Sequence, residues 1–237
     1  MNKPGIFITA LLVFATVFVF AQNDQSINQK DEMGRKQGIW RQTDEKGKLR
    51  YEGYFRDDIP EGEFKHYYED GKIKAVSEIS GNGSWSYTKT YHPNGKMMSE
   101  GLYVDQKKDS LWRFMDEFEN LLTTETYSAG FKNGEMKAFD QDGEIVEILN
   151  YSNDIKEGEW KQFFRNGKPK LEANYKEGKL SGLTKYFFMN GIISSEGNYH
   201  EDLKEGRWNH YNDEGALMLT EEWEKGTLIS SEKHLEE

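Results

Sequence analysis

The chain repeats itself every 24 residues, and this period restricts its fold more than any other feature of the sequence. The clearest copy spans residues 158–181 and reads GEWKQFFRNGKPKLEANYKEGKLS. A fixed period of this length is typical of proteins that stack one supersecondary unit on the next. Eight copies in phase, numbered here from position 0 to position 23, begin at Gly38, Gly62, Ser86, Ser110, Gly134, Gly158, Gly182 and Gly206.

Each unit is predicted to be a β-hairpin. Positions 8 and 9 are Asn-Gly or Asp-Gly in five of the eight units, as in Asn166-Gly167, and aromatic and β-branched residues flank them. These dipeptides favour a two-residue type I′ turn. Residues whose positions sum to 17 would then face each other. Position 20 is usually Gly, Asn or Asp, so we also expect a tight return between units.

This register predicts two cross-strand patterns. Position 0, usually Gly, faces a large side chain at position 17, and we expect the ring there to cover the glycine backbone. Position 3 is basic and position 14 is often Glu, and opposite charges across a hairpin add roughly 0.2–1 kcal/mol per pair. The four predicted pairs are Arg41–Glu52, Lys89–Glu100, Lys161–Glu172 and Lys185–Glu196.

The two faces of the predicted sheet differ. Positions 2, 11 and 17 are apolar and form the expected packing face, whereas the opposite face carries the charged pairs and one aromatic stripe at position 5. Aromatic side chains on a polar face often mark binding surfaces, so we hypothesise that this stripe binds a protein or a glycan. The alternative is that a coiled sheet covers the stripe, or that it packs against the neighbouring lysine stems. The candidate partner-binding stripe is Tyr67, Tyr91, Phe139, Phe163, Phe187 and Tyr211.

The predicted fold class is all-β. Tandem hairpins joined by short returns give an elongated antiparallel meander of tandem 24-residue units. Sixteen such strands would make a sheet on the order of 75 Å long, for which we expect marked twist or coiling.

The N-terminus predicts export. Residues 1–21 resemble a signal peptide cut before Gln22, with an uncleaved anchor as the alternative. We expect a polar lead-in at 22–37, the repeat domain at 38–229 and a C-terminal tail at 230–237. The chain has no cysteine, which excludes disulfides and a lipid-modified N-terminal cysteine. The expected location is the periplasm, the cell envelope or the extracellular space.

The charge of the chain argues against two classes of partner. Without residues 1–21 it has 30 basic and 42 acidic residues, a net charge of −12. Such a charge favours solubility and disfavours nucleic acids and anionic lipid surfaces.

Nothing in the sequence predicts catalysis. His66 and His210 share position 4 but lie six units apart, roughly 58 Å in such a meander, so they cannot share a metal. Turn carboxylates such as Asp57 and Asp58 could bind calcium, although such groups are usually solvated. Nucleotide-binding and hydrolase motifs are absent from the sequence. We therefore expect no enzyme, no metal site and no cofactor.

One unit resembles a known family. Its pattern, G-x-W-x-x-[FY]-x-x-N-G-K followed by Glu and an aromatic residue, is similar to the MORN repeat, and more closely to the variant of bacterial antitoxin-like proteins. The resemblance covers residues 38 to about 229 and implies an interaction scaffold; MORN proteins are often associated with membranes, and some are linked to phospholipids. The matching residues are Gly158, Trp160, Phe163, Asn166, Gly167, Lys168 and Tyr175.

The expected function is that of an exported, non-catalytic scaffold with a protein partner. One alternative is a membrane- or surface-polymer-associated module that binds lipid or glycan. Another, which follows from the antitoxin resemblance, is an immunity or antitoxin protein that neutralises a cytosolic toxin.

Overall fold

The computed structural model describes residues 26–234, and every regular element in this range is a β-strand. The predicted signal peptide, residues 1–21, lies outside the described residues. The strands are β1 Gln29–Lys30, β2 Lys36–Thr43, β3 Leu49–Arg56, β4 Ile59–Tyr67, β5 Ile73–Ser80, β6 Trp85–Tyr91, β7 Met97–Val104, β8 Lys107–Met115, β9 Leu121–Ser128, β10 Phe131–Phe139, β11 Ile145–Ser152, β12 Ile155–Phe163, β13 Pro169–Lys176, β14 Lys179–Leu180, β15 Gly182–Phe187, β16 Ile193–His200, β17 Leu203–Tyr211, β18 Leu217–Glu224 and β19 Thr227–Lys233.

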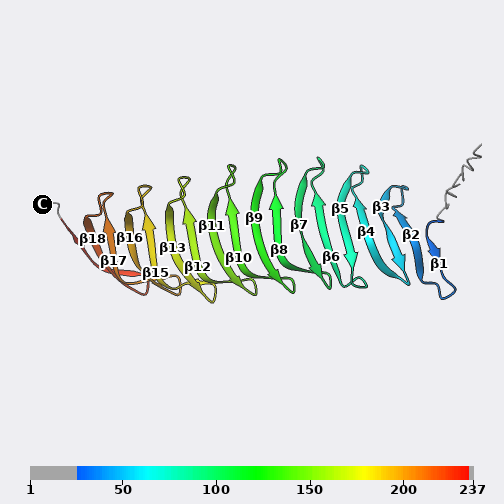
Figure 1. The fold of residues 1–237 in the computed structure, drawn as a ribbon. Helices are drawn as coiled ribbons and strands as arrows, with labels where there is room; N and C mark the ends of the chain where they lie inside the picture. The colour runs from blue at the N-terminus through cyan, green and yellow to red at the C-terminus, as the bar shows by residue number, and fades with distance from the viewer. Residues whose placement is uncertain (1–25, 235–237) are drawn as a thin grey trace, which may run out of the picture.

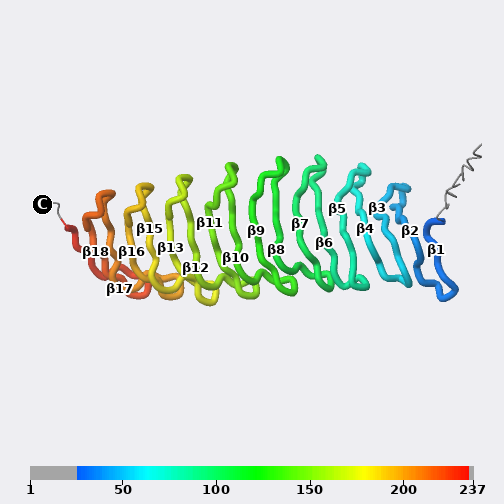
Figure 2. Tube along the Cα trace, in the orientation of Figure 1, coloured from blue at the N-terminus to red at the C-terminus, as the bar shows by residue number. Residues whose placement is uncertain are grey.

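The strands form one antiparallel meander, which confirms the predicted fold class. Each strand pairs with its neighbours in the chain, and β14 and β15 both pair with β13 as two parts of one interrupted strand. Figure 1 shows the strands side by side in a single open row, each bowed along its length. The chain path in Figure 2 turns back after every strand, and the two ends of the described chain lie at opposite ends of the row.

The predicted register is confirmed over most of each hairpin, but the predicted turn is wrong. Gly158 pairs with Tyr175, as positions that sum to 17 should, whereas Phe163 pairs with Pro169 one residue out of that register. The N–H of Gly167 donates to the carbonyl of Phe164 at 2.9 Å. Gly167 has φ +76°, and residue 166 is not left-handed. The hairpin therefore has a three-residue turn, and an extra residue in β13 restores the register.

The type I′ turn occurs at the return between units instead. Glu177 and Gly178, at positions 19 and 20, have φ +52° and +82°. Lys176 and Lys179 pair directly across them. A type I′ turn needs positive φ at both central residues, and its twist matches that of the flanking strands.

Asn at position 8 has a different role from the predicted one. Asn166 Oδ1 accepts the backbone N–H of Lys168 at 3.1 Å, which stabilises its own turn. Its Nδ2 donates to the carbonyl of Met189 in the next turn at 3.0 Å. Asn94 and Asn190 make the same contact with the following turn. The amide therefore joins adjacent units, a contact that Asp could not make.

Glycine at position 0 is required by the backbone rather than by a covering ring. Gly206 has φ +66°, and a Cβ built on it would meet nothing within 4 Å. The predicted cover by the ring at position 17 is therefore wrong. Rings lie over glycines at position 15 instead: a Cβ on Gly197 would lie 2.2 Å from the ring of Trp208. Phe64 covers Gly53 and Trp112 covers Gly101 in the same way.

The buried side chains lie mainly on one face, at positions 2 and 15. Trp112 and Trp208 are each 1% exposed. Position 11, which was predicted on this face, pairs with position 5 because of the register shift, as Tyr67 does with Ile73. Directly paired residues share a face, so this prediction was wrong.

The charged positions have the predicted register but not always the predicted ion pairs. Arg41 Nε lies 3.1 Å from Glu52, as expected. Lys161 is paired in register with Glu172, yet its Nζ lies 2.8 Å from Glu159 on its own strand. Exposed ion pairs contribute about 0–1 kcal/mol, so competing partners differ little in free energy.

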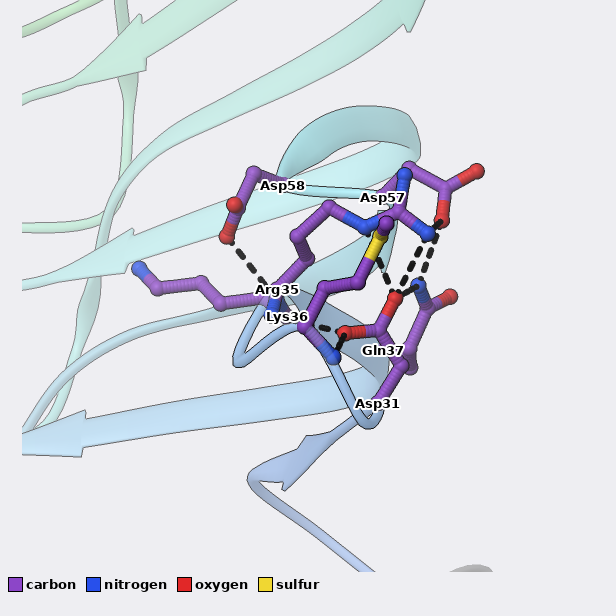
Figure 3. A network of polar contacts seen from close by, with 7 residues as sticks. Asp31, Arg35, Lys36, Gln37, Asp57 and Asp58 are labelled. Atoms are coloured by element: carbon purple, nitrogen blue, oxygen red, sulfur yellow. Dashed lines mark hydrogen bonds and ion pairs between the residues drawn. The ribbon is translucent and has the colours of Figure 1, made fainter.

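A polar network closes the N-terminal edge of the sheet (Figure 3). The guanidinium of Arg35 lies 2.7 Å from Asp31 and 2.8 Å from Asp57. The side-chain amide of Gln37 donates to the same two carboxylates. Hydrogen bonding, above all from the backbone N–H of Arg35, lowers the pKa of Asp31. Charged side chains at a sheet edge discourage the addition of a further strand.

Ordered strands extend into both segments that flank the predicted repeat domain. The strand β1 and the start of β2 lie within the expected lead-in at 22–37, and β19 extends into the expected tail at 230–237. Each of these strands pairs with a terminal unit, as Glu221 does with Ser231.

Candidate functional site

Aromatic side chains at positions 2 and 17 follow the whole length of one face. The two positions share this face because position 2 pairs with position 15 and position 0 with position 17. Neighbouring rings meet edge to face: the ring centroids of Tyr103 and Trp112 lie 4.9 Å apart at 75°, and those of Tyr199 and Trp208 lie 5.2 Å apart at 81°. We call this surface the ring face: Trp40, Phe55, Phe64, Tyr103, Trp112, Tyr127, Tyr151, Trp160, Tyr175, Tyr199, Trp208 and Trp223.

Five lysines at position 22 stand over these rings. The closest is Lys204, whose Nζ lies 4.3 Å from the ring centroid of Trp208. An ammonium over an aromatic ring is attracted by the ring quadrupole, by about 0.5–2 kcal/mol. The sequence reasoning missed this row, although the signal was a lysine that recurs two residues before position 0. The row comprises Lys36, Lys108, Lys132, Lys156 and Lys204.

Lys108 stands over three aromatic rings. Its Nζ lies 4.6 Å from the ring centroids of Trp112 and Phe114 and 5.0 Å from that of Tyr127. Burial lowers the pKa of Lys108, because an enclosed ammonium loses its hydration.

Two glutamates at position 15 neutralise part of the row. Glu125 accepts hydrogen bonds from Tyr127 and from Lys132, the latter at 2.9 Å. Glu221 accepts a hydrogen bond from Trp223 at 2.9 Å and lies 3.5 Å from Lys204. Within the described chain, the other three lysines of the row have no carboxylate within 4.0 Å. The ring face therefore presents unpaired cations at Lys36, Lys108 and Lys156.

The ring face is interrupted at the third unit. Thr88 occupies position 2, where most units have a ring or a methionine, and a pocket of 500 Å³ opens beside it. Phe64, Trp85 and Tyr103 are among the residues that line this pocket.

The position-5 stripe lies on the opposite face, and all six of its side chains are half-buried. Tyr67 donates a hydrogen bond to Glu52 at 2.6 Å, and Tyr211 donates one to Glu196 at 2.9 Å. Burial, together with the bond to Glu52, raises the pKa of Tyr67 to about 12. The bond from Tyr67 is the largest cause of the lowered pKa of Glu52. Binding of a partner by this stripe stays a prediction.

The described residues offer little for chemistry. Residues 26–234 contain no group of three or more His, Cys, Asp or Glu side chains that could hold a metal ion. Nor does this range include a helix with the length and apolar character needed to cross a membrane.

These features define a class of protein: an open, single-layer array of β-hairpins with one long ring-lined face. The MORN repeat variant family matches five stretches of the chain, at residues 36–57, 60–78, 87–105, 132–153 and 156–177. The chain belongs to the MORN-repeat family, whose repeats are generally non-catalytic binding modules. A search of the curated proteins finds no match.

Three of the solved structures that match the chain align with it only weakly. TarM aligns at a TM-score of 0.19 and 14% identity, over 56% of this chain, and the chain spans 19% of the length of TarM. A porin-like protein from Bacteroides uniformis aligns at a TM-score of 0.20 and 8% identity, over 82% of this chain and 92% of its own. The TcdB2-TccC3-Cdc42 structure aligns at a TM-score of 0.20 and 12% identity, over 83% of this chain and 15% of its own length. Such TM-scores are too low to indicate a shared fold.

Proposed function

We propose that this protein is an exported, non-catalytic scaffold that binds a protein partner through its ring face. The observation that carries the proposal is the row of five lysines above aromatic rings. Rings supply large apolar contact area, and cations beside them add direction and charge selectivity.

The arrangement favours an extended partner with acidic and apolar side chains. Carboxylates of the partner would pair with Lys36, Lys108 and Lys156, while apolar side chains would pack on the rings between them. Successive units are about 9.6 Å apart, because each contributes two strands of about 4.8 Å. A partner segment that follows the sheet would therefore meet a similar subsite in each unit.

Export is supported by the sequence of residues 1–21 and by the absence of cysteine. A partner in the cell envelope or outside the cell follows from this, whereas a cytosolic toxin would require the chain to stay in the cytosol.

The test is capture of partners by residues 22–237 from envelope extract, read out by mass spectrometry. The ring-face variant combines Lys36→Gln with Lys156→Gln, and the control combines Phe163→Ser with Phe187→Ser in the position-5 stripe. We expect the ring-face variant to lose capture by about tenfold or more. The control should retain it, after circular dichroism has shown that both variants fold.

Two outcomes would contradict the proposal. Loss of capture in the stripe variant alone would assign binding to the other face. Co-sedimentation of the protein with anionic vesicles, again lost in the ring-face variant, would identify a lipid surface as the ligand instead of a protein.

A further inference from the structure

The pocket beside Thr88 lies where the lysine row and the ring row are both broken. Position 22 is Pro60 before the second unit and Ser84 before the third, whereas Lys108 stands before the fourth. Position 2 is Thr88 in the third unit and Trp112 in the fourth. No lysine of the row therefore caps this pocket, and its volume of 500 Å³ is of the size that holds small ligands.

The walls of the pocket are aromatic. Ser86 pairs directly with Tyr103, so the ring of Tyr103 lies on the same face as Thr88. Tyr103 is held in place by its edge-to-face contact with Trp112, with ring centroids 4.9 Å apart. The Tyr103 hydroxyl makes no hydrogen bond to the described chain. Phe64 also lines the pocket.

The floor of the pocket consists of hydroxyl groups. Ser77 Oγ lies 2.8 Å from Thr88 Oγ1, and Ser86 Oγ lies 3.4 Å from the same atom. Thr90 Oγ1 bonds to Ser99 Oγ at 2.6 Å. A hydroxyl donates one hydrogen bond and accepts two, so these groups keep capacity for a ligand.

In the seventh unit, the equivalent gap is filled by larger side chains. Thr184 replaces the ring there too, but the space is occupied by Leu171 and Tyr186, which pair with each other across the strands. Thr184 is 1% exposed as a result. In the third unit the equivalent pair is Ala75 and Thr90, and the space stays open.

We propose that this pocket binds a neutral saccharide ring. The apolar face of a sugar ring would stack on Tyr103 and Phe64, and its hydroxyls would bond to the Ser and Thr side chains. The lining holds no Asp, Glu, Lys or Arg among the described residues, and burial lowers the pKa of its histidine, His66, so a charged ligand would be desolvated there without a counter-charge. A purely apolar side chain would leave the floor hydroxyls without partners, which is also unfavourable.

This site goes beyond the proposed partner binding and does not depend on it. The lysines that carry the partner proposal lie outside the pocket, so either proposal can fail while the other stands.

The test is isothermal titration calorimetry of residues 22–237 with cellotriose, maltotriose and triacetylchitotriose, each up to roughly 10 mM. Thr90→Tyr fills the pocket with the ring that the seventh unit has naturally. Ala75→Leu fills it from the facing strand, with the other side chain of the pair that the seventh unit has. Lys156→Gln is the control away from the pocket.

We expect at least one trisaccharide to bind the wild-type protein and the control equally. Both pocket variants should weaken that binding by about tenfold or more. If Thr90→Tyr fails to fold, Ala75→Leu still decides. Absence of binding to all three sugars, or equal binding by the folded pocket variants, overturns the proposal. Binding of an apolar probe such as N-acetyl-phenylalanine amide without any sugar binding overturns it too.

Discussion

At the residue scale, two threonines at position 2 differ in how their hydroxyls are satisfied. Thr184 Oγ1 is buried with no hydrogen-bond partner in the described chain. Thr88 is also a buried residue, but its Oγ1 lies 2.8 Å from Ser77 Oγ. An unsatisfied buried hydroxyl is unfavourable by about 1–3 kcal/mol, whereas a satisfied one is near neutral or stabilising.

The same substitution should therefore have opposite effects at the two sites. Thr184→Val is expected to raise the free energy of unfolding by about 1 kcal/mol, because it removes the unpaired hydroxyl without changing the side-chain shape. Thr88→Val is expected to lower it by a similar amount, because it breaks the bond to Ser77. Urea denaturation of both variants checks this, and a loss of stability in Thr184→Val would contradict it.

The Tyr67–Glu52 bond predicts a pH dependence. The pKa of Glu52 is lowered in the folded protein, chiefly by the hydrogen bond from Tyr67. Its contribution to stability is thus complete above the unfolded pKa of 4.5 and is lost as the pH falls through the lower folded value. Tyr67→Phe should destabilise the protein by about 1 kcal/mol at neutral pH and by less under acid conditions.

Urea denaturation at neutral and acid pH measures this difference. Tyr91→Phe is the matched control, because Tyr91 holds the same position and its hydroxyl makes no hydrogen bond to the described chain. An equal effect of both substitutions at every pH would argue against the Glu52 contribution.

At the element scale, each hairpin unit uses glycine for two separate reasons. Gly206 lies within β17, where the pairing of this strand with β16 shifts its register. Its backbone is left-handed, and a Cβ built there would meet no other atom within 4 Å. Gly197 has an ordinary strand conformation but lies under the ring of Trp208. Gly206 is therefore needed for its backbone conformation, and Gly197 is needed because it leaves room for the Trp208 ring.

These two requirements can be separated by substitution. Gly206→Ala should cost about 1–2 kcal/mol from the left-handed conformation alone. Gly197→Ala should cost about 1–3 kcal/mol or more, because its methyl group overlaps the Trp208 ring. Trp208→Leu should reduce the effect of Gly197→Ala and leave that of Gly206→Ala unchanged. Thermal melts of the single and double variants measure this coupling, and additive effects at both sites would contradict it.

At the scale of the whole molecule, the protein is a one-dimensional array. Strands contact their neighbours in the row, and the returns are joined from unit to unit, as by the bond from Gly178 N–H to the carbonyl of Lys156 at 3.0 Å. Stability in such an array is close to a sum of unit and interface terms.

Removal of one whole unit should therefore be tolerated. Deletion of residues 158–181 removes 24 residues and joins equivalent positions, so we expect a folded protein whose urea m-value falls by about one eighth. Deletion of residues 158–180 leaves the downstream units one residue out of phase. Since a one-residue slip moves every side chain to the other face, this variant should fold poorly. Equal stability of the two variants would refute the array description.

The repeat, the hairpin and most of the register could be predicted from the sequence pattern. The 24-residue period and the alternation of side chains are local properties, so positions 0–4 face positions 13–17 as predicted. What it could not determine was the choice of turn. Asn-Gly suits a type I′ turn in isolation, but Asn166 also reaches the next unit, and only the assembled row shows that contact.

The ring face and its lysine row arise from packing between units, which the pattern of a single unit does not show. The register shift beside Phe163 moved position 11 to the opposite face, and the lysine row was assembled from the end of one unit and the rings of the next. The pocket beside Thr88 depends on small side chains at positions 4 and 13 of adjacent strands. These features arise from contacts between units, and a pattern within one unit cannot encode how its neighbour will fill the space.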